Sequence, residues 1–206
     1  AYDAFLKERG FSEAFPSVDA LTRAMGGVSF YYQGRIIENI RISNTVDAYA
    51  VNGWESMKLE NHSGIVDNYR HPKGDPELIA RYNRPLYVAV KLNHKVLGVR
   101  DTATADFYIV NEKNLRGKYT LNAAMKDADG NVLERASWPV TVTGGTTYGE
   151  PLHLGWNLMM RKPGYATVEA ELVRGGETAA AGSDELFAVK LDASGIPTGG
   201  MVADTS

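Results

Sequence analysis

A switch in hydrophobic periodicity at Pro85 constrains the fold of this chain more than any other feature of its 206 residues. Beyond Pro85, apolar and polar residues alternate in "LYVAVKL", "KYTLNAAMKDADGNVLERASWPVTV", "YATVEAELV" and "DELFAVKL". Such alternation is typical of strands with one buried face, and "DADG" within the second run predicts a hairpin turn. Turn signals recur at the spacing of an antiparallel sandwich. We therefore expect an immunoglobulin-like β-sandwich over residues 85–192, followed by a C-terminal tail at 193–206.

Residues 1–84 carry helical patterning instead. Ser17 is a suitable N-cap for "VDALTRAMG", a helix that we expect to stop at the Gly26–Gly27 pair. A second helix is expected in "VSFYYQGRIIENIRIS", with the aliphatic part of Arg41 on its apolar face. A third helical segment is expected from Ser63, and "PELIARYN" adds a turn or two.

Between these helices, "VDAYAV" (Val46–Val51) is apolar on both faces of a strand. That composition is typical of a parallel strand covered on both sides. The order helix, buried strand, helix predicts an α/β unit, so we expect α/β structure in residues 1–84 and all-β structure after them.

Composition and motifs exclude several classes of function. The net charge is −3 and no cluster of Lys and Arg favours a nucleic acid, while no apolar run is long enough to span a membrane. Cysteine is absent and the four histidines lack metal-ligand spacing, so we expect no metal site and no cofactor. In "GGTTYGE", Glu150 stands where a phosphate-binding loop needs Lys, and "DADGN" lacks the downstream Glu of a calcium loop. Both stretches are expected to be ordinary loops.

Asn52, Trp54 and Glu55 follow the predicted strand. Ligands of parallel α/β folds bind at the carboxyl ends of strands. A tryptophan face suits the C–H patches of a sugar ring, and Asn and Glu can hydrogen-bond its hydroxyl groups, so these three residues are candidates for substrate binding. The alternative is a Trp that caps the core beside a solvated Glu. Glu55 and Glu60 are not expected to form a catalytic pair, because glycosidase carboxyls flank one bond from separate supports.

The stretch "TVDAYAVNGWESMKLENHSGIVDNYRHPKGDPELIARYNRPLYVAV" resembles the end of the catalytic (β/α)8 barrel of glycoside hydrolase family 2-like enzymes. The resemblance covers roughly residues 1–100, and the sandwich matches only in kind, as an accessory domain. It implies that residues 1–84 are the C-terminal fragment of a TIM-barrel catalytic domain. The chain starts within a helical pattern and without an initiator Met, so we expect the C-terminal portion of a longer protein.

The family implies a retaining exo-β-glycosidase, such as a β-galactosidase, that takes part in the degradation of poly- or oligosaccharides. Both catalytic glutamates are expected before Ala1, because Glu8 and Glu13 lie in helical or loop context. Trp54 is the position carried over from the family, as part of the floor of the sugar subsite; Asn52 and Glu55 carry less weight. The implied partners are a carbohydrate substrate and the remainder of the same enzyme. The implied location is secreted or periplasmic, and a homo-oligomer remains open.

The alternative is a noncatalytic carbohydrate-binding or interaction module, in which the β-sandwich is the functional unit. Tyr148, Trp156 and Tyr165 would then form an exposed aromatic platform. The competing interpretation, which we favour from the sequence, is that these aromatic residues pack in the core and at the edges of the sandwich.

Overall fold

The computed structural model describes residues 2–51, 53–55, 64–67, 69–145 and 147–190. The chain forms two compact units. The first unit contains the chain up to Ala89 together with Tyr108–Gly117 and Val142–Glu150. The second unit contains Val90–Phe107, Lys118–Thr141 and the chain from Pro151 onward. The predicted tail at 193–206 lies outside the described residues.

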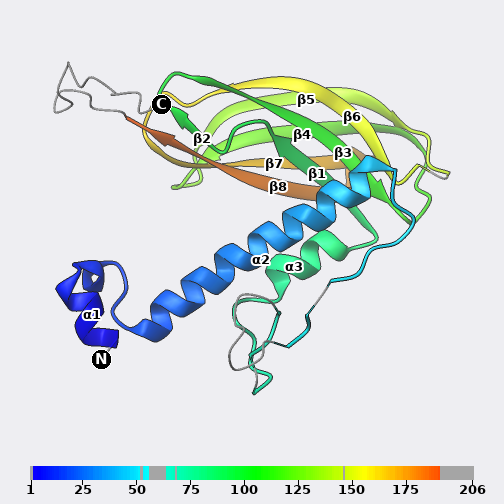
Figure 1. The fold of residues 1–206 in the computed structure, drawn as a ribbon. Coiled ribbons are helices and arrows are strands. Elements are labelled where there is room, and N and C mark those ends of the chain that lie inside the picture. Colours follow the sequence, from blue (N-terminus) through cyan, green and yellow to red (C-terminus); the bar gives the residue numbers. More distant parts are fainter. Residues whose placement is uncertain (1, 52, 56–63, 68, 146, 191–206) are drawn as a thin grey trace, which may run out of the picture. The chain divides into compact units, whose positions relative to one another are not determined.

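The described helices all belong to the first unit (Figure 1). They are α1 (Tyr2–Glu8), the 3-10 turn η1 (Phe11–Glu13), α2 (Val18–Ser43), α3 (Glu77–Ala80) and the 3-10 turn η2 (Arg81–Asn83). Among the described residues, no helix has both the length and the apolar character that crossing a membrane requires.

Helix α2 begins where the sequence predicts and continues where the sequence predicts a stop. The Ser17 hydroxyl caps its first turn by accepting a hydrogen bond from the Ala20 N–H at 3.1 Å. The predicted stop at Gly26–Gly27 is wrong, because the helix runs without interruption to Ser43. A Cβ atom at Gly26 would collide with the backbone carbonyl of Lys73. The glycine therefore serves a close backbone approach rather than a helix end.

Within the described part of the chain, eight strands follow in two sheets, drawn as curved layers in Figure 1. The three-stranded sheet has the order β1-β3-β6 and the five-stranded sheet the order β2-β8-β7-β4-β5. The bounds are β1 (Leu86–Leu92), β2 (Val96–Gly98), β3 (Thr102–Asn111), β4 (Gly117–Asp127), β5 (Val132–Val142), β6 (Gly149–Met159), β7 (Gly164–Arg174) and β8 (Glu177–Val189). The prediction of a β-sandwich is confirmed as far as the strands and their arrangement in two sheets are concerned.

The period-two pattern identifies the buried face of the central strands. The expected inward residues are all buried, namely Tyr119, Leu121, Ala123 and Met125 on β4 and Ala166, Val168, Ala170 and Leu172 on β7. The antiparallel register sets Leu121 opposite Leu172 and Ala123 opposite Ala170, so the apolar faces of the two strands coincide.

The predicted strand at Val46–Val51 is wrong. These residues form no strand and are exposed. A strand that is apolar on both faces needs a cover on each side, whereas every residue of this stretch is exposed. The predicted helix from Ser63 is also wrong over residues 64–67, where Val66 instead makes isolated bridges to Glu55 and Pro72. Among the described part of residues 1–84 there is consequently no barrel strand, and the TIM-barrel portion of the prediction is not confirmed.

The core of the first unit lies against one face of α2. It unites residues of α2, α3, η2, β1 and β3, namely Phe30, Ile37, Ile42, Ile79, Tyr82, Tyr87, Ala89 and Val110. Gly34 allows this packing, because a Cβ atom at this position would overlap the ring of Tyr82. Gly27, on the same helix, has room for a side chain, since a Cβ atom there would meet only the Leu78 side chain, at 3.9 Å.

We predict that Gly34→Ala and Gly27→Ala change the free energy of unfolding in opposite directions. Alanine favours a helix over glycine by about 1 kcal/mol, so Gly27→Ala should stabilise the protein slightly. At Gly34 the same gain is outweighed by overpacking against Tyr82, which typically costs about 1–3 kcal/mol. Urea unfolding monitored by circular dichroism measures both variants. Equal effects of the two substitutions would contradict the close approach of α2 and η2.

Candidate functional site

The predicted sugar platform, Trp54, lies on an exposed loop. Its side chain is 64% exposed, and its carbonyl accepts the N–H groups of Ile65 (2.9 Å) and Val66 (3.1 Å). Glu55 forms a bridge to Val66, and its carboxylate lies 3.8 Å from the guanidinium of Arg70. Asn52 and Glu60 lie outside the described residues. The structure thus presents Trp54 to solvent on a loop that also carries the Glu55–Arg70 ion pair.

Asp67 stabilises the part of this loop that contains Tyr69 and His71. Its carboxylate accepts hydrogen bonds from the N–H groups of His71 (2.9 Å) and Tyr69 (2.8 Å), which hold the pKa of Asp67 below its usual range. The rings of Tyr69 and His71 stack with centroids 6.3 Å apart. Arg70 between them has a φ of 66°, a left-handed conformation that is uncommon outside glycine. We name residues 53–55, 64–67 and 69–73 the aromatic loop.

A separate cavity of about 680 Å³ in the first unit is lined by part of the wrongly predicted strand. This part of the lining consists of Val46, Asp47, Ala48 and Tyr49, and the other lining residues are Ile40, Arg41, Asn44, Glu112 and Tyr148. Arg41 in its wall is buried and forms an ion pair with Glu112 at 2.5 Å. This pair fixes the position of the Glu112 carboxylate in the wall, and the remaining walls combine aliphatic, polar and aromatic side chains.

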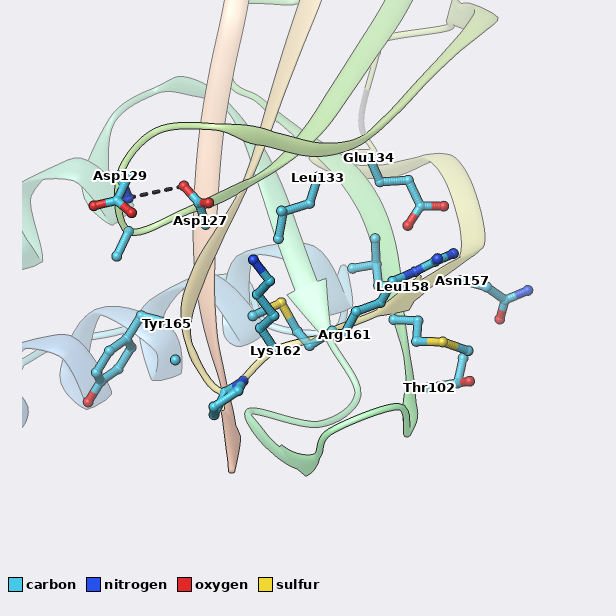
Figure 2. Close-up of a pocket in the computed structure, with 15 residues that line it drawn as sticks. Thr102, Asp127, Asp129, Leu133, Glu134, Asn157, Leu158, Arg161, Lys162 and Tyr165 are labelled. Carbon is cyan, nitrogen blue, oxygen red and sulfur yellow. Dashed lines mark hydrogen bonds between the residues drawn. The ribbon is translucent and has the colours of Figure 1, made fainter. Parts of the chain in front are cut away.

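The second unit contains a larger groove, of about 1050 Å³ (Figure 2). The turn between β4 and β5 lines it together with the turn between β6 and β7 and the adjoining ends of these strands. In Figure 2, Lys162 occupies the middle, Arg161 extends toward Glu134, and Tyr165 lies at the opposite end. We name this feature the turn groove. It combines an exposed aromatic ring with side chains of both charges.

The "DADGN" stretch is the turn on the acidic side of this groove, as predicted. The Asp127 carboxylate accepts hydrogen bonds from the Asn131 side chain (3.1 Å), the Asn131 N–H (2.8 Å) and the Asp129 N–H (3.0 Å). These bonds, and the nearby charge of Lys162, hold the pKa of Asp127 below its usual range. Among the described residues, no group of three or more acidic or histidine side chains could hold a metal ion.

The three aromatic residues of the alternative prediction have different environments. Trp156 is a core residue, buried against Phe107 with ring centroids 6.0 Å apart. Tyr148 and Tyr165 are exposed, although the Tyr165 ring also packs against Phe187 with centroids 4.7 Å apart. Of the three residues, only Trp156 packs in the core. Tyr148 lines the cavity of the first unit and Tyr165 lines the turn groove. They belong to different cavities and do not form one platform with Trp156.

Several residues of these sites were not identified from the sequence. Arg70 and His71 belong to the stretch "YRHPKGDP", in which the proline and glycine indicate only an interruption between helical segments. Arg161 and Lys162 precede Pro163-Gly164, a dipeptide that marks a turn between two predicted strands. Two cations at such a turn are a usable signal, because a turn at the end of a sandwich holds its side chains outside the core.

Comparisons with known proteins give only a weak likeness of fold. No protein-family model and no curated protein matches the chain. Among solved structures, a glycosyl hydrolase family 2 member from Bacteroides cellulosilyticus shares 14% identity and a TM-score of 0.38 over 50% of this chain and 15% of that chain. A putative beta-galactosidase from Bacteroides fragilis shares 14% identity and a TM-score of 0.35 over 50% of this chain and 16% of that chain.

The CARDB domain of a Pyrococcus furiosus protein, in complex with di-metal ions, is similar over 52% of this chain and 94% of its own. Identity is 17% and the TM-score is 0.40. The chain thus spans about one sixth of the length of the two hydrolases and nearly all of the CARDB domain. Similarity this low assigns neither an activity nor a ligand to this chain.

We predict that Asp127 makes the stability of the protein depend on pH. Because its folded pKa is depressed, the carboxylate contributes stability above its unfolded pKa of about 3.9, and this contribution disappears as the pH falls through the folded pKa. Asp127→Asn should therefore lower the melting temperature at pH 7, and the difference from the original protein should vanish in strong acid. Asp129→Asn is the control, because Asp129 enters the turn through its backbone N–H. A difference that stays constant with pH would show that the charge of Asp127 does not stabilise the turn.

Proposed function

We propose that this chain is the C-terminal portion of a retaining exo-β-glycosidase that acts on poly- or oligosaccharides. Its catalytic glutamates would lie in the preceding part of the enzyme, and the β-sandwich would serve as an accessory domain. In a retaining mechanism one carboxylate attacks the sugar and a second acts as acid and base, about 5–5.5 Å away. The role assigned to this chain is to supply one wall of the sugar subsite.

The exposure of Trp54 is the observation that carries this proposal. Tryptophan is highly buried on average, and an exposed indole offers a ligand a large apolar face and one N–H donor. The same loop carries the carboxylate of Glu55 and the guanidinium of Arg70, which lie 3.8 Å apart. A loop that offers an apolar face, a hydrogen-bond acceptor and a hydrogen-bond donor suits a pyranose ring, which has C–H patches on its faces and hydroxyl groups at its edge.

Helix α2 supports the idea that further protein covers the first unit. The buried face of this helix includes Phe30, Gly34, Ile37 and Arg41. A second apolar stripe is exposed and has residues three or four positions apart, namely Met25, Val28, Tyr32 and Ile36. At about 3.6 residues per turn the two stripes fall on opposite faces. A helix that is apolar on opposite faces is typical of one packed between two layers, as a barrel helix beside an accessory domain would be.

We predict that Trp54→Ala in the complete enzyme lowers kcat/KM by about tenfold or more on a small glycoside, because the sugar loses its stacking face. Trp54→Phe should retain most of the activity. The melting temperature should hardly change, since the indole is exposed. Tyr165→Ala, in the other unit, is the control and should leave this activity unchanged. Near-normal kinetics of Trp54→Ala would sink the assignment of Trp54 to the sugar subsite.

We predict that the isolated chain associates with itself through the exposed stripe of α2, because a contiguous apolar surface avoids water. The double variant Val28→Thr with Ile36→Gln should reduce this association without lowering the melting temperature. Phe30→Gln, on the buried face, should instead unfold the first unit, since it places a polar group in the core. Light scattering measures association. If the isolated chain is monomeric and binds no apolar dye, the proposal that further protein covers this stripe of α2 is wrong.

A second candidate function is a noncatalytic carbohydrate-binding β-sandwich. The turn groove favours it, because Tyr165 is 63% exposed at one end of the groove and both polar and apolar side chains line the rest. The two functions are compatible within one enzyme, and experiments can distinguish them. Loss of turnover in Trp54 variants supports the glycosidase role, and glycan binding that depends on Tyr165 supports the binding module.

A further inference from the structure

We propose that the turn groove binds a neutral oligosaccharide chain, and that it neither holds an acidic or basic polymer nor takes part in the reaction. This inference rests on the second candidate function and names its ligand class. It is independent of Trp54, which belongs to the other unit.

The size of the groove suits a chain of sugars. Its volume of about 1050 Å³ lies just above the range for small-molecule sites, about 300–1,000 Å³. Two turns, the strand ends beside them and Thr102 of β3 line it, so the walls come from five strands that the sandwich holds in place. A groove of this size accommodates several linked rings better than one small metabolite.

The apolar contact surface is held rigidly. Tyr165 on β7 pairs directly with Phe187 on β8, and their ring centroids are 4.7 Å apart. This cross-strand contact restricts the tyrosine ring, which therefore loses little freedom when a ligand stacks on it. Leu133 and Met159 are also exposed in the groove and add apolar surface for the C–H groups of a sugar.

The charges of the groove select against a polyelectrolyte. Arg161 and Lys162 supply two positive charges, and Asp127, Asp129 and Glu134 supply three negative ones, so the sum is −1. An acidic polymer would face three carboxylates, and a basic polymer two cations. Like charges brought together at an interface oppose binding. A hydroxyl group both donates and accepts hydrogen bonds, so a neutral polyol can use the cations as donors and the carboxylates as acceptors.

Affinity gel electrophoresis of the 206-residue chain tests this inference. The probes are a soluble galactan and hydroxyethyl cellulose as neutral polymers, polygalacturonate as an acidic polymer and chitosan as a basic one. The expected result is retardation by at least one neutral polymer and a much smaller effect of the charged ones. Tyr165→Ala should weaken that retardation about tenfold, the effect of losing one stacking contact of about 1.4 kcal/mol, while Tyr165→Phe should retain it.

Matched controls separate the groove from the rest of the molecule. Tyr2→Ala removes another exposed tyrosine, on α1, and should leave retardation unchanged. Lys162→Ala combined with Glu134→Gln leaves the net charge unchanged and should weaken binding of the neutral polymer. Absence of retardation by both neutral polymers, preferential binding of a charged one, or full binding by Tyr165→Ala overturns the inference. Each of these results leaves the glycosidase role of Trp54 standing.

Discussion

The buried guanidinium of Arg41 holds the first unit together. It donates to the carbonyl of Tyr82 at 2.6 Å and to the Glu112 carboxylate at 2.5 Å, and it lies over the ring of Tyr87 at 5.5 Å. Arg41 therefore joins helix α2 to the turn η2, to strand β1 and to the residue after β3. A buried charge without partners costs several kcal/mol, so this guanidinium fixes how α2 packs against the other three segments. Gly34 then lets the helix approach the Tyr82 ring about two turns earlier.

Much of the β structure could be predicted from the sequence because the signal is local. In β4 and β7 the inward residues of the alternating pattern are buried, and "DADG" ends β4 through hydrogen bonds that Asp127 makes with residues up to Asn131. The N-cap of α2 is local in the same way, since Ser17 bonds to Ala20. Such features depend on neighbours in the chain and need no knowledge of the tertiary fold.

The remainder depends on partners distant in the sequence. Gly26 resembles a helix end until Lys73 is brought against it. The helical pattern predicts only an aliphatic contact for Arg41, whereas its partners Tyr82 and Glu112 lie 41 and 71 residues away. For Val46–Val51, the apolar pattern describes an environment with two covering layers, which the described residues do not supply. The candidate site shares this limit, because residue type alone points to Trp54, whereas Arg70 reaches Glu55 only through the folded loop.

Trp54 and Tyr165 are held in physically different ways, which is compatible with different roles for them. Trp54 is anchored by backbone hydrogen bonds of a loop that also contains the left-handed Arg70. Local strain and loop support are common where a site must be completed by other segments. Tyr165 belongs to a continuous strand pair and is braced by Phe187. A site on paired strands has its geometry before the ligand arrives and loses little entropy on binding. The paired strands around Tyr165 therefore suit the binding of a polymer. The loop that carries Trp54 is compatible with a subsite wall that other parts of an enzyme complete.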